Sequence, residues 1–196
     1  RVEALVRSNK SLLANASHEL RSPLARMKMA VSMLDEVPAA QHEKLKREIE
    51  TNVAELDALV EELLLASRLD ASESIERRDA VDLLALAVEE GSRVEAEVDG
   101  PSLAVQGDER LLRRALRNLL ENARRYGGGE VKVELARSSA GAEVHVCDRG
   151  PGVPEGLRDR IFEPFYRLPG HAEQAGGVGL GLSLVRQIAQ RHGGSV

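Results

Sequence analysis

The residues best suited to group-transfer chemistry lie near the start of the chain, in the run SHELRSPL at residues 17–24. An imidazole such as His18 can attack a phosphoryl group through one ring nitrogen if an acceptor holds the proton on the other. Glu19 is the adjacent carboxylate and our candidate general base. Ser22 shares the helix face of His18, one turn later. On spacing alone, an ordinary surface histidine is the simpler interpretation.

A second group of candidate residues lies in NLLENARRY, at residues 118–126. Asn118 and Asn122 are four residues apart, so their amide oxygens share one helix face and can bind one Mg²⁺ together with phosphate. Arg125 can hold phosphates and Tyr126 can cover a base. A solvated amphipathic helix would carry the same residues, so this segment alone does not define a site.

Two glycine-containing loops complete the candidate chemistry. DRGPG at residues 148–152 follows an apolar alternation, which places Asp148 at a strand end where it can accept a hydrogen bond from an exocyclic amine. A plain turn is the alternative. GGVGLGL at residues 176–182 runs into a helix whose N-terminal amides suit a phosphate. It lacks the lysine of a phosphate-binding loop and opens no βαβ unit, so neither a Walker nor a dinucleotide motif fits.

The first candidate helix must be held by a helical hairpin. Spacings of four and three define one apolar stripe: Leu13, Ser17, Leu20, Leu24, Met27, Val31 and Leu34. After a turn at residues 37–39, a second stripe follows: Leu45, Ile49, Asn52, Val53, Leu56, Leu59, Val60 and Leu63. We expect an all-α hairpin that dimerises into a four-helix bundle, although a spacer without chemistry has the same pattern. Pro23 predicts a kink rather than a break, because the stripe continues in phase.

The period is lost around residues 71–74, and mixed helix and strand patterns follow. We expect helices at residues 81–90, 108–126 and 182–192. Strand alternation occurs at residues 94–98, 131–135 and 144–146, with a hairpin turn at 138–141. Interleaved helices with adjacent hairpin strands favour an α+β layer fold over a doubly wound parallel sheet.

Composition excludes several classes of protein. The 196 residues include 27 Lys and Arg against 32 Asp and Glu, and this acidic balance gives no footprint for nucleic acid. The single cysteine, Cys147, rules out a disulfide framework and is interpreted as a buried small residue. No apolar run is long enough to cross a bilayer. Helical sequence begins at once, and a strand begins after the final Gly-Gly, so we expect a fragment of a longer protein.

Together these segments resemble sensor histidine kinases of two-component systems. Residues 17–24 resemble the phospho-acceptor box, 118–126 the N box, 148–152 the first glycine box, 161–167 (IFEPFYR) the F box and 177–182 the second glycine box. The resemblance implies a Bergerat (GHKL) ATP-binding fold, an α/β sandwich with a mobile ATP lid between the glycine boxes. We expect a dimerisation and phosphotransfer hairpin at 1–71, a linker at 72–79 and an ATP-binding catalytic domain at 80–196 with its last strand truncated.

The resemblance also implies roles for individual residues. His18 is the acceptor, Asn118 and Asn122 bind Mg²⁺, Arg125 holds phosphates, and Arg167 reaches the γ-phosphate. Tyr126 and Asp148 bind adenine. The remaining residues expected to bind ATP belong to the two glycine boxes: Gly150, Gly152, Gly177, Gly179, Leu180, Gly181 and Leu182.

Partners and location follow from the same resemblance. Family members pass the phosphoryl group to an aspartate of a response-regulator receiver domain, many also dephosphorylate it, and commonly they are homodimers anchored in the bacterial inner membrane with the kinase in the cytoplasm. Ser22 stands where this subfamily usually has Thr or Asn. Its hydroxyl can still position a water, but Ser has more rotamer freedom than Thr, which makes phosphatase activity a weaker expectation than kinase activity.

Two rival functions remain. A freestanding ATPase of the same fold uses a carboxylate to activate water at the position of Asn118, and the amide there argues for transfer to a protein nucleophile instead. A non-catalytic dimer scaffold switched by nucleotide is the second rival. The route of transfer depends on the handedness of the hairpin turn at residues 37–41, which the sequence leaves open. We expect transfer in trans, across the dimer.

Overall fold

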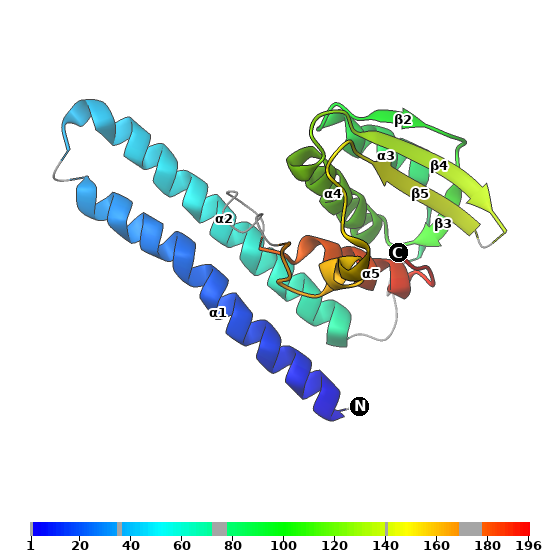
Figure 1. Cartoon of the computed structure of the whole chain (residues 1–196), viewed down its shortest axis with the longest axis horizontal. Coiled ribbons are helices and arrows are strands. Elements are labelled where there is room, and N and C mark those ends of the chain that lie inside the picture. Colours follow the sequence, from blue (N-terminus) through cyan, green and yellow to red (C-terminus); the bar gives the residue numbers. More distant parts are fainter. Residues whose placement is uncertain (1, 35–36, 72–77, 140, 169–177) are drawn as a thin grey trace.

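The computed structural model describes residues 2–34, 37–71, 78–139, 141–168 and 178–196. Two long antiparallel helices form an arm, and a compact α/β domain lies against the second of them (Figure 1). Among the described helices, none combines the length and the apolar character needed to cross a membrane. The chain therefore divides into a helical hairpin and an α/β layer domain, as the two sequence patterns predict.

The hairpin consists of α1 (Val2–Met33) and α2 (Ala39–Ala71), and Pro23 lies inside a continuous α1. The helix break considered for Pro23 is therefore excluded. Buried residues of the hairpin recur every seven positions: Ala16, Pro23 and Ala30 on α1, with Leu45, Asn52 and Leu59 on α2. Small residues at this seam let the two helices pack along their length.

This seam lies beside the stripe expected on α1 rather than on it. Leu24 and Val31 belong to that stripe and are both more than half exposed. The difference has a physical reason, because an apolar stripe wide enough for a bundle has two flanks, and the hairpin uses only one of them. The other flank stays available for packing against another molecule.

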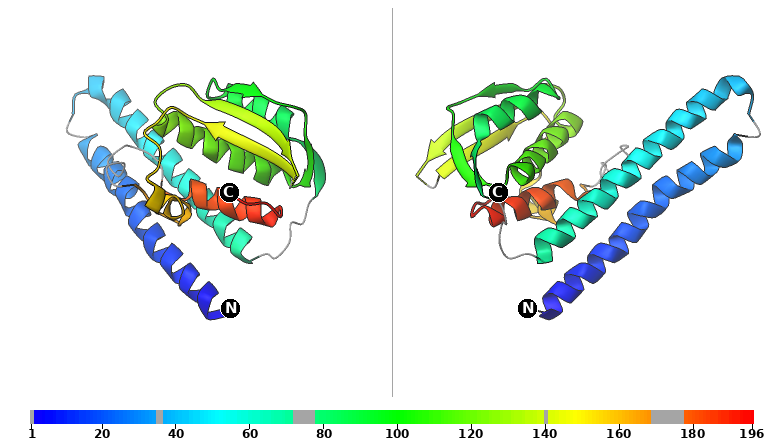
Figure 2. Two further views of the ribbon diagram at one scale, coloured as in Figure 1. Left: turned by 45° about the vertical axis from the view of Figure 1, so that its right-hand side comes forward. Right: turned by 180° about the vertical axis from the view of Figure 1, so that it is seen from behind.

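The α/β domain follows in the order β1 (Asp79–Asp82), α3 (Leu83–Ser92), β2 (Glu97–Asp99), β3 (Ala104–Gly107), α4 (Glu109–Tyr126), β4 (Lys132–Ser138), β5 (Gly141–Cys147), η1 (Glu155–Leu157), η2 (Arg160–Phe162) and α5 (Gly181–Arg191). Strand β4 pairs in parallel with β2 and antiparallel with β5, while β1 and β3 form a separate antiparallel pair. Helices α3 and α4 cover one face of the larger sheet (Figure 2). The predicted α+β layer fold is confirmed.

The core of this domain lies between that sheet and its covering helices. Leu86 on α3, Leu116 and Leu120 on α4, and Val133 and Leu135 on β4 are buried together. Each fully buried aliphatic side chain contributes about 1.5–3 kcal/mol of transfer free energy. Helix α4 thus buries one face in the core and keeps the other for the candidate site.

A buried carboxylate ties α3 to α4. Glu90 is 1% exposed and accepts hydrogen bonds from Arg113 (3.0 Å) and from Arg117 (2.8 and 3.0 Å). The hydrogen bonds from Arg117, followed by those from Arg113, hold the pKa of Glu90 below its ordinary value despite burial. The carboxylate therefore stays ionised and acts as a cross-link between the two helices.

Two local expectations need correction. The helix expected at residues 81–90 begins at Leu83, because Val81 lies in β1 and the Asp82 carboxylate caps the helix by accepting from the amides of Leu84 and Ala85. The pair β1 and β3 was not predicted, since four-residue strands give too little alternation to be seen.

Cys147 is exposed at the end of β5, so the prediction that it is buried is wrong.

Candidate functional site

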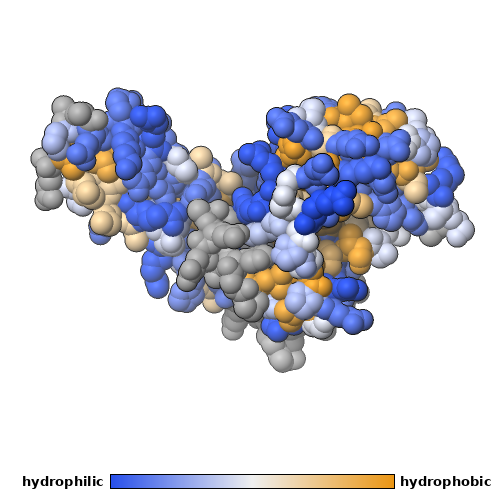
Figure 3. Space-filling view, turned by 45° about the horizontal axis from the view of Figure 1, so that its top comes forward, coloured by the Kyte–Doolittle hydropathy of each residue, from blue (hydrophilic) through white to orange (hydrophobic). Residues whose placement is uncertain are grey.

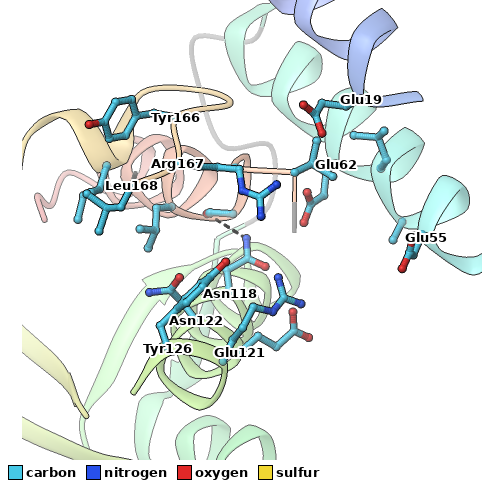
Figure 4. Close-up of a pocket in the computed structure, with 18 of the residues that line it drawn as sticks. Glu19, Glu55, Glu62, Asn118, Glu121, Asn122, Tyr126, Tyr166, Arg167 and Leu168 are labelled. Carbon is cyan, nitrogen blue, oxygen red and sulfur yellow. Dashed lines mark hydrogen bonds between the residues drawn. The ribbon is translucent and has the colours of Figure 1, made fainter. Parts of the chain in front are cut away.

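A pocket of about 870 Å³ lies between the hairpin and the α/β domain. One wall comes from α1 and α2, and the other from α4, the loop after β5 and the two stretches flanking residues 169–177 (Figure 4). In Figure 3, hydrophilic side chains gather on both sides of the notch between the two parts of the molecule. The volume is in the range of small-molecule sites.

The acceptor segment forms part of the hairpin wall. His18 is exposed on α1 and lies next to the pocket lining, while its neighbours Glu19, Ser22 and Pro23 line the pocket itself. Glu19 is half-buried and its side chain is directed toward the α/β domain in Figure 4. His18 is therefore accessible to solvent.

The opposite wall contains the two asparagines of α4. Asn118 is buried, and its Nδ2 donates to the Gly181 carbonyl at 3.1 Å. Because the amide nitrogen is held by this carbonyl, the Oδ1 atom is the one that can face a cation. Asn122 lies one turn further on the same face and also lines the pocket. This donor set of neutral oxygens suits Mg²⁺ if phosphate oxygens complete the coordination.

The end of α4 and the loop after β5 form the next part of the wall. Arg125, Tyr126, Asp148, Gly150 and Gly152 all line the pocket. The Asp148 Oδ1 atom accepts from the Gly150 amide at 2.8 Å, which fixes the turn.

Gly150 is needed because the loop approaches α4 closely. A Cβ at this position would lie 2.5 Å from the Tyr126 carbonyl oxygen, a distance that no side chain can occupy. The glycine therefore brings Asp148 and Tyr126 to the same end of the pocket.

The stretches on either side of residues 169–177 are held side by side. The Phe165 amide donates to the Gly179 carbonyl at 2.9 Å, and Gly179 adopts a φ of +78°. A Cβ on Gly179 would lie 2.9 Å from the Phe165 carbonyl carbon, so this crossing also requires glycine. The Arg186 guanidinium lies over the Phe162 ring, 4.3 Å from its centre, and fixes η2 against α5.

These stretches bring further predicted residues to the pocket. Arg167 points into it from the α/β side in Figure 4, and Gly179, Gly181 and Leu182 line it. Leu180 is fully buried beneath the pocket rather than in its lining. Gly177 lies outside the described residues.

Acidic side chains on α2 were missed by the sequence interpretation. Glu48, Glu55 and Glu62 line the pocket at spacings of seven residues, which places them on one face of α2. Glu121 of α4 lines it too. The regular spacing was visible in the sequence, but it resembles a solvated helix face, which is the usual meaning of such a pattern.

An interface below the pocket holds the α/β domain on the hairpin. Ala66 and Leu69 of α2 pack with Leu184 and Ile188 of α5 in a small buried cluster. Beside it, the Arg114 Nη2 atom donates to Glu62 at 3.0 Å.

Polar contacts and burial accompany this cluster. The Gln187 amide donates to Asp70 at 3.1 Å, and Arg191 donates to the Leu69 carbonyl. Burial raises the pKa of the Glu62 and Asp70 carboxyls, while Arg114 and Arg191 respectively act in the opposite direction. We call this contact the docking interface.

The fold and pocket define a nucleotide-binding α/β domain joined to a helical hairpin with an accessible histidine. Residues 8–72 match the His Kinase A (phospho-acceptor) domain, and residues 107–196 match the family of histidine kinase-, DNA gyrase B- and HSP90-like ATPases. The chain belongs to the sensor histidine kinases.

Individual relatives agree with this assignment. The chain is 38% identical to the sensor protein RstB of Escherichia coli and 34% identical to its sensor histidine kinase CpxA, in each case over 100% of this chain and 46% and 45% of the relative. The chain thus spans about half the length of these curated relatives. Among solved structures, it resembles the histidine kinase AdeS of Acinetobacter baumannii, with a TM-score of 0.72 and 25% identity over 89% of this chain and 86% of that one. The mycobacterial sensor histidine kinase MprB has a TM-score of 0.53 and 34% identity, over 59% and 80% of the two chains.

Proposed function

We propose that this chain is the catalytic part of an autophosphorylating protein-histidine kinase that transfers the γ-phosphoryl group of ATP to His18. The observation that carries the proposal is the shared pocket, in which Glu19 and Ser22 of the acceptor helix face Asn118, Asn122 and Arg167 of the α/β domain. A freestanding ATPase would have no use for an acceptor helix along its nucleotide site.

Each wall has its own part in binding ATP. Asn118 and Asn122 would hold Mg²⁺, which would neutralise charge on the phosphates. Arg125 would contact the phosphates, and Tyr126 and Asp148 would bind the base at the other end of α4. The solved full-length ShkA, which the chain resembles with a TM-score of 0.60 and 27% identity over 94% of this chain and 41% of that one, is described in complex with AMPPNP, an ATP analogue. That description supports a nucleotide in the corresponding pocket here.

Transfer requires an in-line attack by the imidazole. A His18 ring nitrogen attacks the γ-phosphorus while the bond to the bridging oxygen breaks, and ADP leaves with the electron pair. The proton on the other ring nitrogen passes to Glu19, whose half-buried carboxylate is adjacent in the chain. Arg167 stabilises the charge on the transferring group from the α/β side.

The pocket favours transfer within one chain, the reverse of the route expected from the sequence. The Glu19 and Ser22 side chains that line it belong to the same chain as Asn118 and Arg167. This arrangement would let each nucleotide site act on the acceptor helix of its own chain. We propose cis autophosphorylation on this ground.

The partners of the full-length protein are part of the proposal. A second copy would cover the exposed flank of the hairpin and complete a four-helix bundle, and a response-regulator receiver domain would accept the phosphoryl group from His18 on an aspartate. We also propose that the full-length protein is anchored in the bacterial inner membrane, with the chain described here on its cytoplasmic side. These proposals about the dimer, the receiver domain and the membrane anchor are supported by the membership of the chain in a family of sensor proteins.

The proposed activity is tested by incubating the protein with ATP labelled at the γ-phosphate and Mg²⁺. Phosphohistidine is labile in acid and stable in base, so label with this behaviour is expected on the protein. Label that is acid-stable, or free phosphate released without protein labelling, would instead support a different kinase or the ATPase alternative.

A further inference from the structure

Arg26 lies in the pocket, two turns after His18 on α1, and connects three side chains. Its Nη1 atom donates to the Ser22 Oγ atom at 2.9 Å, its Nε atom donates to the Asn52 Oδ1 atom at 2.6 Å, and its Nη2 atom pairs with Glu55 at 2.6 Å. All four residues line the pocket. The planar guanidinium thus joins α2 to the hydroxyl of Ser22, which lies one turn from His18 on the same face of α1.

The α2 end of this connection is fixed. Asn52 is only 3% exposed, and its Nδ2 atom donates to the Glu48 carbonyl at 2.6 Å. With its nitrogen held by the helix backbone, the Asn52 oxygen is directed at Arg26. Glu55, one turn further along α2, balances the charge of the guanidinium. Asn52 and Glu55 together fix the position of the Arg26 guanidinium.

The hydroxyl at the other end gains a defined orientation. A serine side chain can occupy three χ1 rotamers, and it lacks the branching methyl group that restricts threonine. The Arg26 N–H selects the rotamer in which Oγ meets it, and it occupies one of the two lone pairs of the oxygen. The second lone pair can still accept a hydrogen bond from water.

From this geometry we propose that Arg26 is a positioning residue for the dephosphorylation of a phospho-aspartyl receiver domain, a role it performs by holding the Ser22 hydroxyl. The inference rests on the proposed function, because it assumes that a receiver docks at this face. In the reaction, the oxygen of a water held by Ser22 attacks phosphorus and the bond to the aspartyl oxygen breaks. The aspartate leaves as a carboxylate, and the proton of the water passes to the released phosphate or to solvent.

This role can be separated from a merely structural one. If Arg26 only cross-links α1 and α2, its loss lowers stability, and the residue at position 22 has no influence on the effect. If it orients Ser22, then a side chain that holds its own rotamer at position 22 removes the need for Arg26. Threonine is such a side chain, because its β-branching restricts χ1.

The test uses purified receiver domains loaded with acetyl phosphate, so that it does not depend on kinase activity. The receiver that the wild-type chain dephosphorylates fastest is the substrate. Ser22→Ala and Arg26→Ala are each expected to lower kcat by about tenfold, with KM for the receiver unchanged and the double variant no worse than either single one. Ser22→Thr in the Arg26→Ala background is expected to restore most of the rate. Lys28→Ala, which removes another exposed cation of α1, is the matched control and is expected to match the wild type.

Several results would overturn the inference. They are a wild-type chain without phosphatase activity on any receiver, additive losses in the double variant, or no recovery with Ser22→Thr. The proposed kinase function fails by a different result, the absence of acid-labile label from ATP. The two outcomes are therefore distinguishable.

Discussion

The hairpin and the α/β domain bury their apolar residues in different ways. The hairpin seam uses Ala16, Pro23 and Ala30 on α1, while larger side chains stay outside: Leu24 and Val31 are 52% and 53% exposed, and Val53 and Val60 are 43% exposed. The α/β domain instead encloses its leucines and valines between a sheet and two helices. One region is complete within a single chain, and the other needs a second surface.

This difference separates two requirements of the proposed kinase. The domain that binds nucleotide must fold on its own so that it can act on a nearby helix. The hairpin would instead combine with a second copy, as proposed above, because isolated helix pairs with exposed apolar flanks are marginally stable. Variants that affect only the hairpin or only the α/β domain can test whether the two regions are stabilised in these different ways.

The largest effect is expected from charging the open flank of the hairpin. Val53→Lys combined with Val60→Lys would place four ammonium groups in the proposed dimer core, where unpaired charge is costly. We expect dimer dissociation to increase by at least about a hundredfold, measured by sedimentation or light scattering.

Val88→Lys is the matched control, because Val88 is an exposed valine of the α/β domain at 52%. It is expected to leave association unchanged. A chain that remains dimeric after both hairpin substitutions would show that this flank is not the interface.

An effect of similar size is expected from the loss of the Glu90 cross-link. Glu90→Gln would leave Arg113 and Arg117 without their shared carboxylate, and we expect unfolding of the α/β domain to become easier by about 3 kcal/mol. Thermal unfolding monitored by circular dichroism measures this change. A shift of less than about 0.5 kcal/mol would mean that the ion pairs are not stabilising.

The Glu90 carboxylate also predicts how the stability of the α/β domain changes with pH. Because hydrogen bonds from Arg117 and Arg113 lower the pKa of Glu90, its contribution is fully present above the ordinary value of 4.5 and is lost as the pH falls through the lowered pKa. Denaturant titrations between pH 7 and pH 3 should show this loss in the wild type and a smaller one in Glu90→Gln. Equal slopes would contradict the assignment.

The smallest effect concerns the docking interface, where the two regions meet. Burial raises the pKa of Glu62, so the docked state binds protons more readily and docking should strengthen as the pH falls through that raised pKa. Spin labels on the hairpin and on the α/β domain would report the change as a distance distribution.

Substitutions at the Glu62 and Arg114 pair sharpen this test. Glu62→Gln should remove that carboxyl's part of the pH response, while Arg114→Ala should weaken docking by about 1–2 kcal/mol at neutral pH, because it leaves Glu62 buried without its 3.0 Å partner. A distance distribution insensitive to both substitutions would show that the pair does not hold the domains together.

Most of the site residues predicted from the sequence line the pocket, and they were predictable because their motifs are local. Asn118 and Asn122 are one turn apart, and the glycine loops have short, dense signals. The docking and positioning contacts were not predictable in this way. Arg26 meets Asn52 across 26 positions and Arg114 meets Glu62 across 52, and such pairs leave no periodic trace in a sequence.

The hairpin shows the same limit in its packing. Its period was visible, but the choice between two flanks of one stripe depends on how the helices turn at residues 34–39, where few residues carry a signal. The seam at Ala16 and Ala30 was therefore missed, although the stripe beside it was found.

Transfer in cis requires that one chain holds both the nucleotide site and the histidine it phosphorylates, and mixed dimers distinguish this route from transfer in trans. Two dimers are purified through a different affinity tag on each subunit and incubated with γ-labelled ATP. The first joins a wild-type subunit to one carrying both His18→Gln and Asn122→Ala, and the second joins a His18→Gln subunit to an Asn122→Ala subunit. With transfer in cis, we expect label on the wild-type subunit of the first dimer and none on the second. Label on the second dimer, or none on the first, would contradict it.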